Sequence, residues 1–417
     1  TLFKQYNKLL DNGIIPVAVN VDGIETSVNS DIHFDATWKH EGIKLTRIPL
    51  PVSVIERPIV SVDLTQLEEF TKTQILPRLL HLSGAGGNGK THQILQYRKS
   101  YKKILYMAPT NDAVKNLIDK AKEEDQTRKT FQCPPIEAHT YHKVFGFNCW
   151  NNFPIGKYTH FVIDECSMMS NEHLSIILSK LSKNQSLILA GDFWQLECVN
   201  GSQIYNTKLR IKSKEYQQFE IKELTKNWRQ KEDPEFFQLC SKLRRRVKPL
   251  EAKEIIDKLN TRVVQTLPEN TTINDIHICG INKQVDFVNK DYKMVVGCKV
   301  ICQMKCLSKE KNEICNGSIG FITNISPLQI DFSGVINTFR GIGKTKDDRP
   351  RFKPAYGLTV HKAQGKTLKR NVIINPTRFF AMNHLYVALT RATRLSNVYF
   401  TKKITIEMLK KTVCIHF

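Results

Sequence analysis

The sequence predicts an α/β protein with two domains built on parallel sheets and a small β-rich insertion in the second. From about residue 79, short apolar runs of strand length alternate with segments whose apolar residues recur at helical spacing. A second set of the same kind follows residue 220, and a β-rich stretch with many turn residues interrupts it. Strand–helix–strand repetition implies a parallel sheet that is covered by helices on both faces.

The first set opens with a strand at 79–83, a glycine-rich loop and a helix from Lys90. Further strands are expected at 104–108, 161–164 and 187–190. The helix after the second strand is amphipathic, with apolar residues at Ala113, Val114, Leu117, Ile118 and Ala121. The first domain is predicted to span 61–215, with a short insertion near 133–160. Residues 1–60 are an N-terminal extension of unclear fold, or the tail of an upstream module in a longer protein.

The second set is expected at 216–297 and 355–417. Its first helix should begin at Asp233-Pro234, because a capping carboxylate precedes proline at the first helical position. Strands are expected at 276–279, 372–374 and 398–400. Residues 298–354 contain turn pairs such as Asn316-Gly317 and Ser333-Gly334, and are predicted to form a small inserted β domain.

The charge points to a polyanionic partner. The chain of 417 residues has 62 Lys and Arg against 40 Asp and Glu, a net charge of +22. Residues 1–60 have a net charge of −1, which leaves +23 on residues 61–417. This favours nucleic acid over an anionic membrane surface as the partner of the two predicted domains. The sequence has no apolar run of the roughly 18 residues that an integral membrane protein needs.

The eleven cysteines predict a reduced, intracellular protein, since a chain of this length does not need disulfides to fold. Cys298, Cys302 and Cys306 alternate as on one face of a strand, with Cys315 nearby. We expect small buried side chains there, the alternative being a zinc site. The chain begins at Thr1 without a secretory segment, and we interpret it as part of something longer.

One glycine-rich segment has the spacing of a phosphate-binding loop. Gly84-Ala85-Gly86-Gly87-Asn88-Gly89-Lys90-Thr91 follows a predicted strand and opens a predicted helix. Glycines let the backbone N–H groups and the helix N-terminus face a phosphate. Lys90 is expected to reach the β- and γ-phosphates of ATP, and the Thr91 hydroxyl to bind Mg²⁺.

Two carboxylates stand at the end of the apolar strand Phe161–Ile163. Asp164 is the candidate second ligand of Mg²⁺, and Glu165 is the candidate group that orients and deprotonates water. The next strand, 187–190, is followed by Gly191-Asp192-Phe193-Trp194-Gln195, which places Gln195 where a sensor of the γ-phosphate would lie. These features predict an NTPase.

The order of several further motifs resembles the superfamily 1 helicases, in particular the Pif-type and RecD-type branch. The matching segments are 108–113, 138–146, 227–230, 315–320, 356–365 and 386–392. The resemblance covers about residues 61–400 and implies two RecA-like domains. It departs from the usual pattern at Glu197-Cys198, where the branch has two prolines.

The resemblance also implies roles for individual residues. Arg229 and Arg391 would contact the γ-phosphate across the cleft between the domains, and Gln66 would read the adenine base, with Gln74 as a competitor. The implied nucleic-acid contacts are Pro109, Thr110, Asn111, His139, Thr140, His142, Thr359, His361 and Lys362. Nearby aromatic residues are expected to serve core packing more often than base stacking: Tyr141, Phe145, Phe147, Trp150, Trp194 and Trp228.

The sequence therefore predicts an ATP- and Mg²⁺-dependent helicase that moves 5′→3′ on single-stranded DNA and acts on DNA duplexes and forks. The direction follows from the resemblance. We expect it to act in replication, recombination or repair, in a nucleus, a nucleoid or a viral replication site, and with other proteins of that process. The alternatives are an RNA or RNA–DNA hybrid helicase, and a nucleotide-switched binding module that does not unwind.

Overall fold

The computed structural model describes residues 16–20, 23–26, 60–62, 76–127, 135–147, 153–198, 201–207, 209–244, 247–265, 275–332, 334–343, 350–381 and 383–412. Gln66, Gln74 and Trp150 lie outside these residues. The chain divides into two compact units, Thr1–Arg57 and Pro58–Phe417. In the first unit, β1 (Pro16–Asn20) pairs antiparallel with β2 (Gly23–Thr26).

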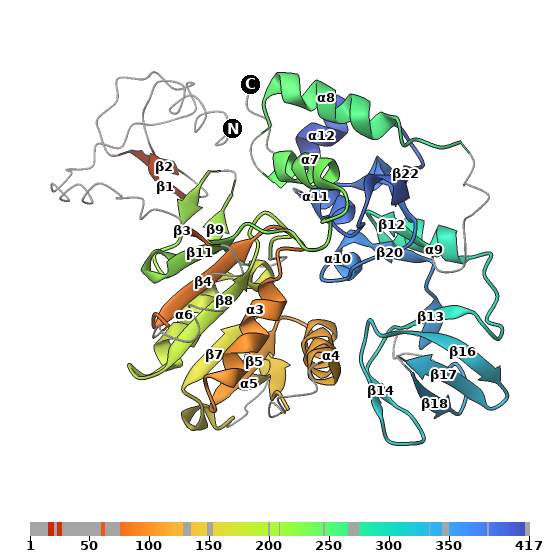
Figure 1. The fold of residues 1–417 in the computed structure, drawn as a ribbon, viewed down its shortest axis with the longest axis horizontal. Coiled ribbons are helices and arrows are strands. Elements are labelled where there is room, and N and C mark those ends of the chain that lie inside the picture. The colour runs from red at the N-terminus through yellow and green to blue at the C-terminus, as the bar shows by residue number, and fades with distance from the viewer. Residues whose placement is uncertain are drawn as a thin grey trace. The chain divides into compact units, whose positions relative to one another are not determined.

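The second unit contains a seven-stranded sheet in which every pair of neighbours is parallel (Figure 1). In spatial order its strands are β3 (Val60–Val62), β11 (Glu220–Leu224), β4 (Leu79–Gly84), β8 (Ser186–Gly191), β7 (His160–Ile163), β5 (Ile104–Ala108) and β6 (Ala138–Thr140). Its helices are α3 (Lys90–Gln96), α4 (Asn111–Thr127), α5 (Tyr141–Phe145) and α6 (Asn171–Lys180). The predicted parallel α/β architecture is confirmed.

Both faces of this sheet are buried, as the apolar strands predict. In β5, Leu105 and Met107 pack into one apolar cluster, while Tyr106 and Ala108 pack into another. Because successive side chains of a strand point to opposite faces, each cluster fills one side of the sheet. The short connecting elements are the 3₁₀ turns Tyr97–Lys99, Ile155–Lys157, Cys166–Met168 and Tyr216–Gln218, and the strands β9 (Tyr205–Asn206) and β10 (Ile211–Lys212).

The second sheet is also parallel, in the order β20 (Gly357–Thr359), β12 (Ile276–Cys279), β21 (Val372–Asn375) and β22 (Val398–Phe400). Its helices are α7 (Pro234–Arg244), α8 (Pro249–Asn260), α9 (Asn282–Asn289), α10 (Val360–Ala363), α11 (His384–Leu389) and α12 (Ile406–Thr412), with 3₁₀ turns at Pro376–Arg378 and Leu395–Asn397. The predicted start of α7 is confirmed, since the Phe236 amide donates to Asp233 Oδ1 at 2.9 Å.

One segment that the sequence assigns to the second domain forms a strand of the first sheet. The predicted boundary at residue 215 assigns residues 220–224 to the second domain, but β11 pairs with β3 and β4 in the first sheet. The chain therefore returns to the first sheet before it enters α7.

Between α9 and β20 lies an antiparallel five-stranded sheet, in the order β18 (Val335–Phe339), β17 (Leu328–Phe332), β16 (Ile319–Ile325), β13 (Lys299–Cys302) and β19 (Phe352–Pro354). A short hairpin joins β14 (Cys306–Leu307) to β15 (Glu313–Ile314). In Figure 1 this inserted sheet stands apart from the second parallel sheet and is joined to it near β13.

The expectation of one continuous strand through Cys298, Cys302 and Cys306 is wrong. β13 ends at Cys302, and Cys306 begins the hairpin, with the two sulfur atoms 3.8 Å apart. Cys298 and Cys302 are buried, and Cys306 and Cys315 are half-buried. Among the described residues, no group of three or more His, Cys, Asp or Glu side chains is placed to hold a metal ion. In the same part of the chain, no helix has the length and apolar character to cross a membrane.

A buried histidine in β4 makes the stability of the fold depend on pH. His81 is 1% exposed and packs against Phe193 and Tyr216. Burial lowers its pKa from 6.5 to about 3, so the unfolded chain binds a proton below pH 6.5 that the folded protein does not bind. The stability is therefore unaffected above pH 6.5 and falls as the pH drops toward 3. At pH 5 we expect this histidine alone to cost about 2 kcal/mol in the free energy of unfolding.

Urea unfolding at pH 7 and pH 5 measures this effect. The loss of stability between these two pH values should be smaller by about 2 kcal/mol in His81→Gln than in the unsubstituted protein. His92→Gln is the control, because His92 is exposed. Equal pH dependence in the two variants would contradict the assignment.

Candidate functional site

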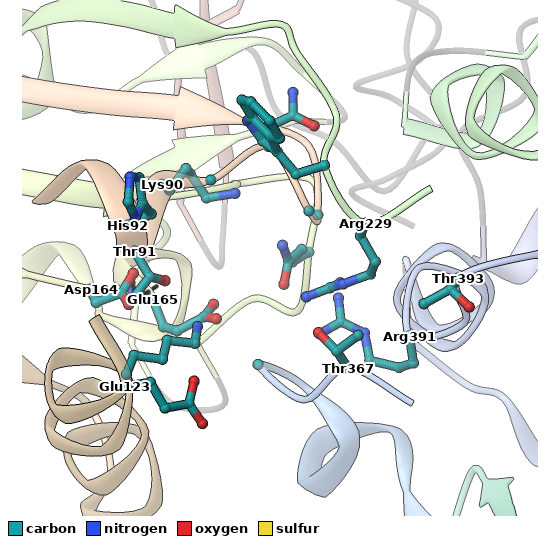
Figure 2. Close-up of a pocket in the computed structure, with 18 of the residues that line it drawn as sticks. Lys90, Thr91, His92, Glu123, Asp164, Glu165, Arg229, Thr367, Arg391 and Thr393 are labelled. Carbon is teal, nitrogen blue, oxygen red and sulfur yellow. Dashed lines mark hydrogen bonds between the residues drawn. The ribbon is translucent and has the colours of Figure 1, made fainter. Parts of the chain in front are cut away.

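The glycine-rich loop runs from the end of β4 into α3 and lies in a cleft of about 700 Å³ (Figure 2). Two of its glycines allow close approaches that a larger residue would block. A Cβ on Gly84 would lie 2.8 Å from the Leu224 carbonyl oxygen, and a Cβ on Gly87 would lie 2.6 Å from Arg229 Cβ. Gly87 and Gly89 also have positive φ angles, of 95° and 78°. The sequence of the loop thus fits the tight turn that turns backbone amides toward a phosphate.

The Lys90 side chain folds back onto the glycine-rich loop that precedes it. Its ammonium group donates to the carbonyl oxygens of Gly84 at 2.7 Å and Ala85 at 3.0 Å. Burial lowers the pKa of Lys90. A buried cation gains most from an anion that enters its pocket, and a triphosphate supplies one.

Thr91 and Asp164 form an oxygen pair that fits Mg²⁺. The Thr91 hydroxyl donates to Asp164 Oδ2 at 3.0 Å, close to the ~2.9 Å that separates adjacent ligands in an octahedron with Mg–O distances of 2.0–2.1 Å. Burial, followed by the charge of Glu165, raises the pKa of Asp164 to about 6. A divalent cation at this point relieves both effects, so the donor set and its electrostatics suit the metal.

Glu165 is held in a conformation that is rare for its residue type. Its φ angle is +52°, and its amide donates to Asp164 Oδ1 at 2.9 Å. Such backbone strain is typical of functional positions. The side chain faces the cleft beside Thr91 and Asp164, as Figure 2 shows.

Two arginines line the opposite side of the cleft (Figure 2). Arg391 is 1% exposed, and its Nε and Nη2 donate to Val387 O at 3.0 Å and Thr390 Oγ1 at 2.9 Å. Arg229 Nη1 donates to Thr390 O at 2.7 Å. Burial and then the neighbouring Arg391 lower the pKa of Arg229 to about 9, and burial lowers that of Arg391. Two adjacent cations, Arg391 buried and Arg229 half-buried, create a strong preference for an anion between them and Lys90.

The route by which Arg229 reaches the cleft differs from the predicted domain boundaries. It follows β11, a strand of the first sheet, so it is carried by the connection between the domains. This connection is fastened to the loop, because the Trp228 amide donates to Gly87 O at 2.9 Å and Asn227 Nδ2 donates to Gly86 O at 3.1 Å. Trp228 itself lines the cleft, and Lys226 Nζ lies 4.5 Å from the centre of its ring.

Gln195 lines the same cleft and is 3% exposed. In the described part of the chain its side-chain oxygen has no hydrogen-bond partner. A buried polar atom without a partner is costly unless a ligand satisfies it. The residue therefore lies where the sequence predicts a sensor of the terminal phosphate, and its role stays a prediction.

A buried network that the sequence did not reveal connects the two parallel-sheet domains. The Gly86 amide donates to the Tyr386 hydroxyl at 3.2 Å, and that hydroxyl donates to Asp192 Oδ2 at 2.8 Å. Arg244 continues the network, with Nε 3.0 Å from Asp192 Oδ1 and Nη1 2.6 Å from Glu223 Oε1. Asp192 and Tyr386 both lie in motifs described above, but their spacing in the sequence does not predict that they contact each other across the domains.

Removing the Tyr386 hydroxyl should destabilise this arrangement. In Tyr386→Phe the Gly86 amide and the Asp192 carboxylate each lose a buried partner, so we expect the free energy of unfolding to fall by about 1–3 kcal/mol. Urea unfolding without nucleotide measures the loss. Tyr399→Phe is the matched control, because no hydroxyl hydrogen bond of Tyr399 is found among the described residues and its ring contacts Arg262. Equal stability of the two variants would show that the network contributes nothing.

The candidate nucleic-acid residues lie where their strands end. Pro109, Thr110 and Asn111 follow β5, whereas His139 and Thr140 end the neighbouring β6 and precede His142 in α5. Thr359, His361 and Lys362 lie at the end of β20 and in α10. The hydroxyls of three of these threonines accept helix-capping hydrogen bonds: Thr110 from Ala113 N, Thr140 from Lys143 N, and Thr359 from Lys362 N, at 3.2–3.3 Å. Each of these hydroxyl groups can still donate a hydrogen bond to a phosphate oxygen. The contact of all these residues with nucleic acid stays a prediction.

Most of the candidate stacking aromatics pack within the protein. Tyr141 and Phe145 are 2% exposed and belong to the core of the first sheet, and Phe147 and Trp194 pack against apolar clusters. Their described surroundings favour the packing interpretation. Beside Glu197-Cys198, Gln203 Nε2 donates to Glu197 Oε2.

Comparison with known proteins agrees with this architecture. A family model described as an AAA domain matches residues 67–200. The RecBCD enzyme subunit RecD of Buchnera aphidicola subsp. Schizaphis graminum (strain Sg) is 24% identical over 442 residues, covering 81% of this chain and 73% of the relative. Pif1 helicase from Bacteroides in complex with ADP-AlF3 and ssDNA has a TM-score of 0.62 at 20% identity, covering 84% of this chain and 94% of that one. Pif1 helicase from Candida albicans has a TM-score of 0.55 at 18% identity, covering 84% and 95%.

The two parallel-sheet domains bring a phosphate-binding loop, a carboxylate pair and two arginines to one cleft, and they have the fold of the solved Pif1 helicase structures. The chain is thus similar to RecD in sequence and to the Pif1 helicases in fold.

Proposed function

We propose that this protein is an ATP-dependent DNA helicase that moves 5′→3′ on single-stranded DNA. The observation that carries the proposal is the composition of the cleft. The loop, Asp164 and Glu165 come from the first domain, whereas Arg391 comes from the second. ATP can contact both Lys90 and Arg391 only when the two domains are close together. Hydrolysis of ATP therefore changes the strength of the interaction between the domains.

In this proposal each residue has a separate role in hydrolysis. Lys90 neutralises the β- and γ-phosphates, and Glu165 orients the attacking water and accepts its proton. Arg229 and Arg391 stabilise the charge that develops on the transferred phosphoryl group. Thr91 and Asp164 would hold Mg²⁺, which neutralises phosphate charge when it is bound.

The proposed base-binding surface is the indole of Trp228. It is 46% exposed, lines the cleft and is attached to the loop through the Gly87 carbonyl. An aromatic face beside a phosphate site suits stacking on a nucleobase. Gln66, predicted to read adenine, lies outside the described residues.

Charge and the named relatives support DNA as the track. Residues 61–417 have a net charge of +23, which supplies backbone affinity that falls steeply as salt rises. The titles of related Pif1 structures name ssDNA and forked dsDNA. None of these relatives is described with RNA, and the RNA alternative therefore has no support from them. Since RecD is named as a subunit of the RecBCD enzyme, we further propose an intracellular protein partner in replication or repair.

An unwinding assay with ATP and Mg²⁺ tests the proposal. Partial duplexes with a 5′ tail or a 3′ tail, made of DNA or RNA, are compared, and Lys90→Ala is the control for ATP dependence. We expect unwinding of the 5′-tailed DNA duplex alone. Preference for a 3′ tail would overturn the direction, preference for RNA would overturn the substrate, and the absence of ATP turnover with single-stranded DNA would overturn the enzyme.

A further inference from the structure

The catalytic carboxylate candidate is contacted by a glutamine of the other domain. Gln364 Nε2 donates to Glu165 Oε2 at 3.1 Å. Gln364 is 8% exposed, and a Cβ on the adjacent Gly365 would lie 3.5 Å from Glu165 Oε1. Within the described residues, this is the only side-chain hydrogen bond to the Glu165 carboxylate. The orientation of that carboxylate therefore depends on a residue 199 positions away in the chain.

Gln364 belongs to the same short segment as the candidate nucleic-acid contacts of the second domain. Thr359, His361 and Lys362 precede it, and the Gln364 amide donates to Val360 O at 3.1 Å as α10 ends. Because this hydrogen bond ties Gln364 to the helical turn that contains Lys362, we expect a displacement of Lys362 to move Gln364 as well.

The far end of the segment is tied to the first domain near its own nucleic-acid candidates. Lys366 Nζ lies 2.7 Å from Asp112 Oδ2, and Asp112 directly follows Asn111 at the start of α4. Both partners are largely buried, with 17% and 24% of their side chains exposed. The segment Thr359–Lys366 thus joins the two groups of candidate nucleic-acid residues and contacts Glu165 between them.

We propose that Gln364 is the positioning residue through which bound nucleic acid activates ATP hydrolysis. Seating of the segment Thr359–Lys366 on the nucleic-acid backbone fixes Gln364, and Gln364 fixes the Glu165 carboxylate toward the attacking water. Glu165 needs this support because its strained backbone does not itself determine where the carboxylate points. The inference rests on the proposed function and adds the residue that connects its two sites.

The test compares ATP turnover at saturating ATP with and without oligo(dT). In Gln364→Ala we expect the DNA-stimulated kcat to fall by about 10²-fold. The KM for ATP and the affinity for oligo(dT) should change less than about 3-fold, because the loop and the residues Thr359, His361 and Lys362 are unchanged. Gln364→Glu keeps the length and replaces the donor with a second carboxylate, and it should lose stimulation to the same extent while keeping the packing. Gln217→Ala is the control, since that amide bonds to the Lys212 carbonyl at an exposed site.

A double-substitution cycle separates positioning from a general structural effect. If Gln364 acts through Glu165, then adding Gln364→Ala to Glu165→Gln lowers the residual rate no further. Two results would overturn the inference, provided that oligo(dT) stimulates turnover in the unsubstituted protein. One is an additive loss of rate in the double variant, and the other is full stimulation in both Gln364 variants. If the unsubstituted protein shows no turnover with oligo(dT), the proposed function fails, and this inference falls with it.

Discussion

Arg391→Ala should lower the kcat for ATP hydrolysis by about 10³-fold while ATP still binds. The guanidinium is fixed by Val387 and Thr390 and faces the phosphate loop from the second domain. A cation that is already oriented and desolvated stabilises transition-state charge without reorganisation. ATP affinity should be retained because Lys90 and the loop amides supply most ground-state contacts.

Single-turnover hydrolysis and equilibrium binding of a fluorescent ATP analogue measure the two effects separately. Arg378→Ala is the control, since Arg378 is an exposed arginine of the same domain. Unchanged turnover in Arg391→Ala would show that the second domain contributes no charge to the reaction.

Lys90→Ala should reduce turnover by about 10²–10³-fold or more and leave binding of single-stranded DNA intact. The ammonium group is the cation of the loop itself, and no other lysine of the cleft lies on the loop. Its present partners are two loop carbonyls, so its removal also leaves acceptors unsatisfied. Steady-state hydrolysis and oligo(dT) anisotropy check both statements, and Lys90→Met separates the loss of charge from the loss of volume. Normal hydrolysis in either variant would contradict the assignment of the loop.

The chemistry at the phosphate end of the site is predictable because it is local in sequence. Eight consecutive residues form the loop, and Asp164 and Glu165 stand where an apolar strand ends. Carboxyl ends of parallel strands meet at one edge of a sheet, which brings these groups together without further information. Thr91 Oγ1 and Asp164 Oδ2 lie 3.0 Å apart because both residues are placed at this edge.

The contacts between the domains are not predictable in this way. No strand is expected at β11, and its pairing with β4 places it in the first sheet. The positions of Trp228 and Arg229 against the loop follow from that pairing. Tyr386 meets Gly86 across 300 residues, and Gln364 meets Glu165 across 199. Such pairs depend on the relative placement of two domains, which spacing along the chain does not encode.

The hydrogen bonds of the loop determine what a nucleotide has to displace when it binds. Lys90 donates to the Gly84 carbonyl, and the Tyr386 hydroxyl accepts from the Gly86 amide. A phosphate that binds to Lys90 and to the Gly86 amide competes with these internal partners, so the bonds that it breaks offset part of its binding free energy. Nucleotide affinity at this loop is therefore a difference between two sets of hydrogen bonds, one of which reaches the second domain through Tyr386.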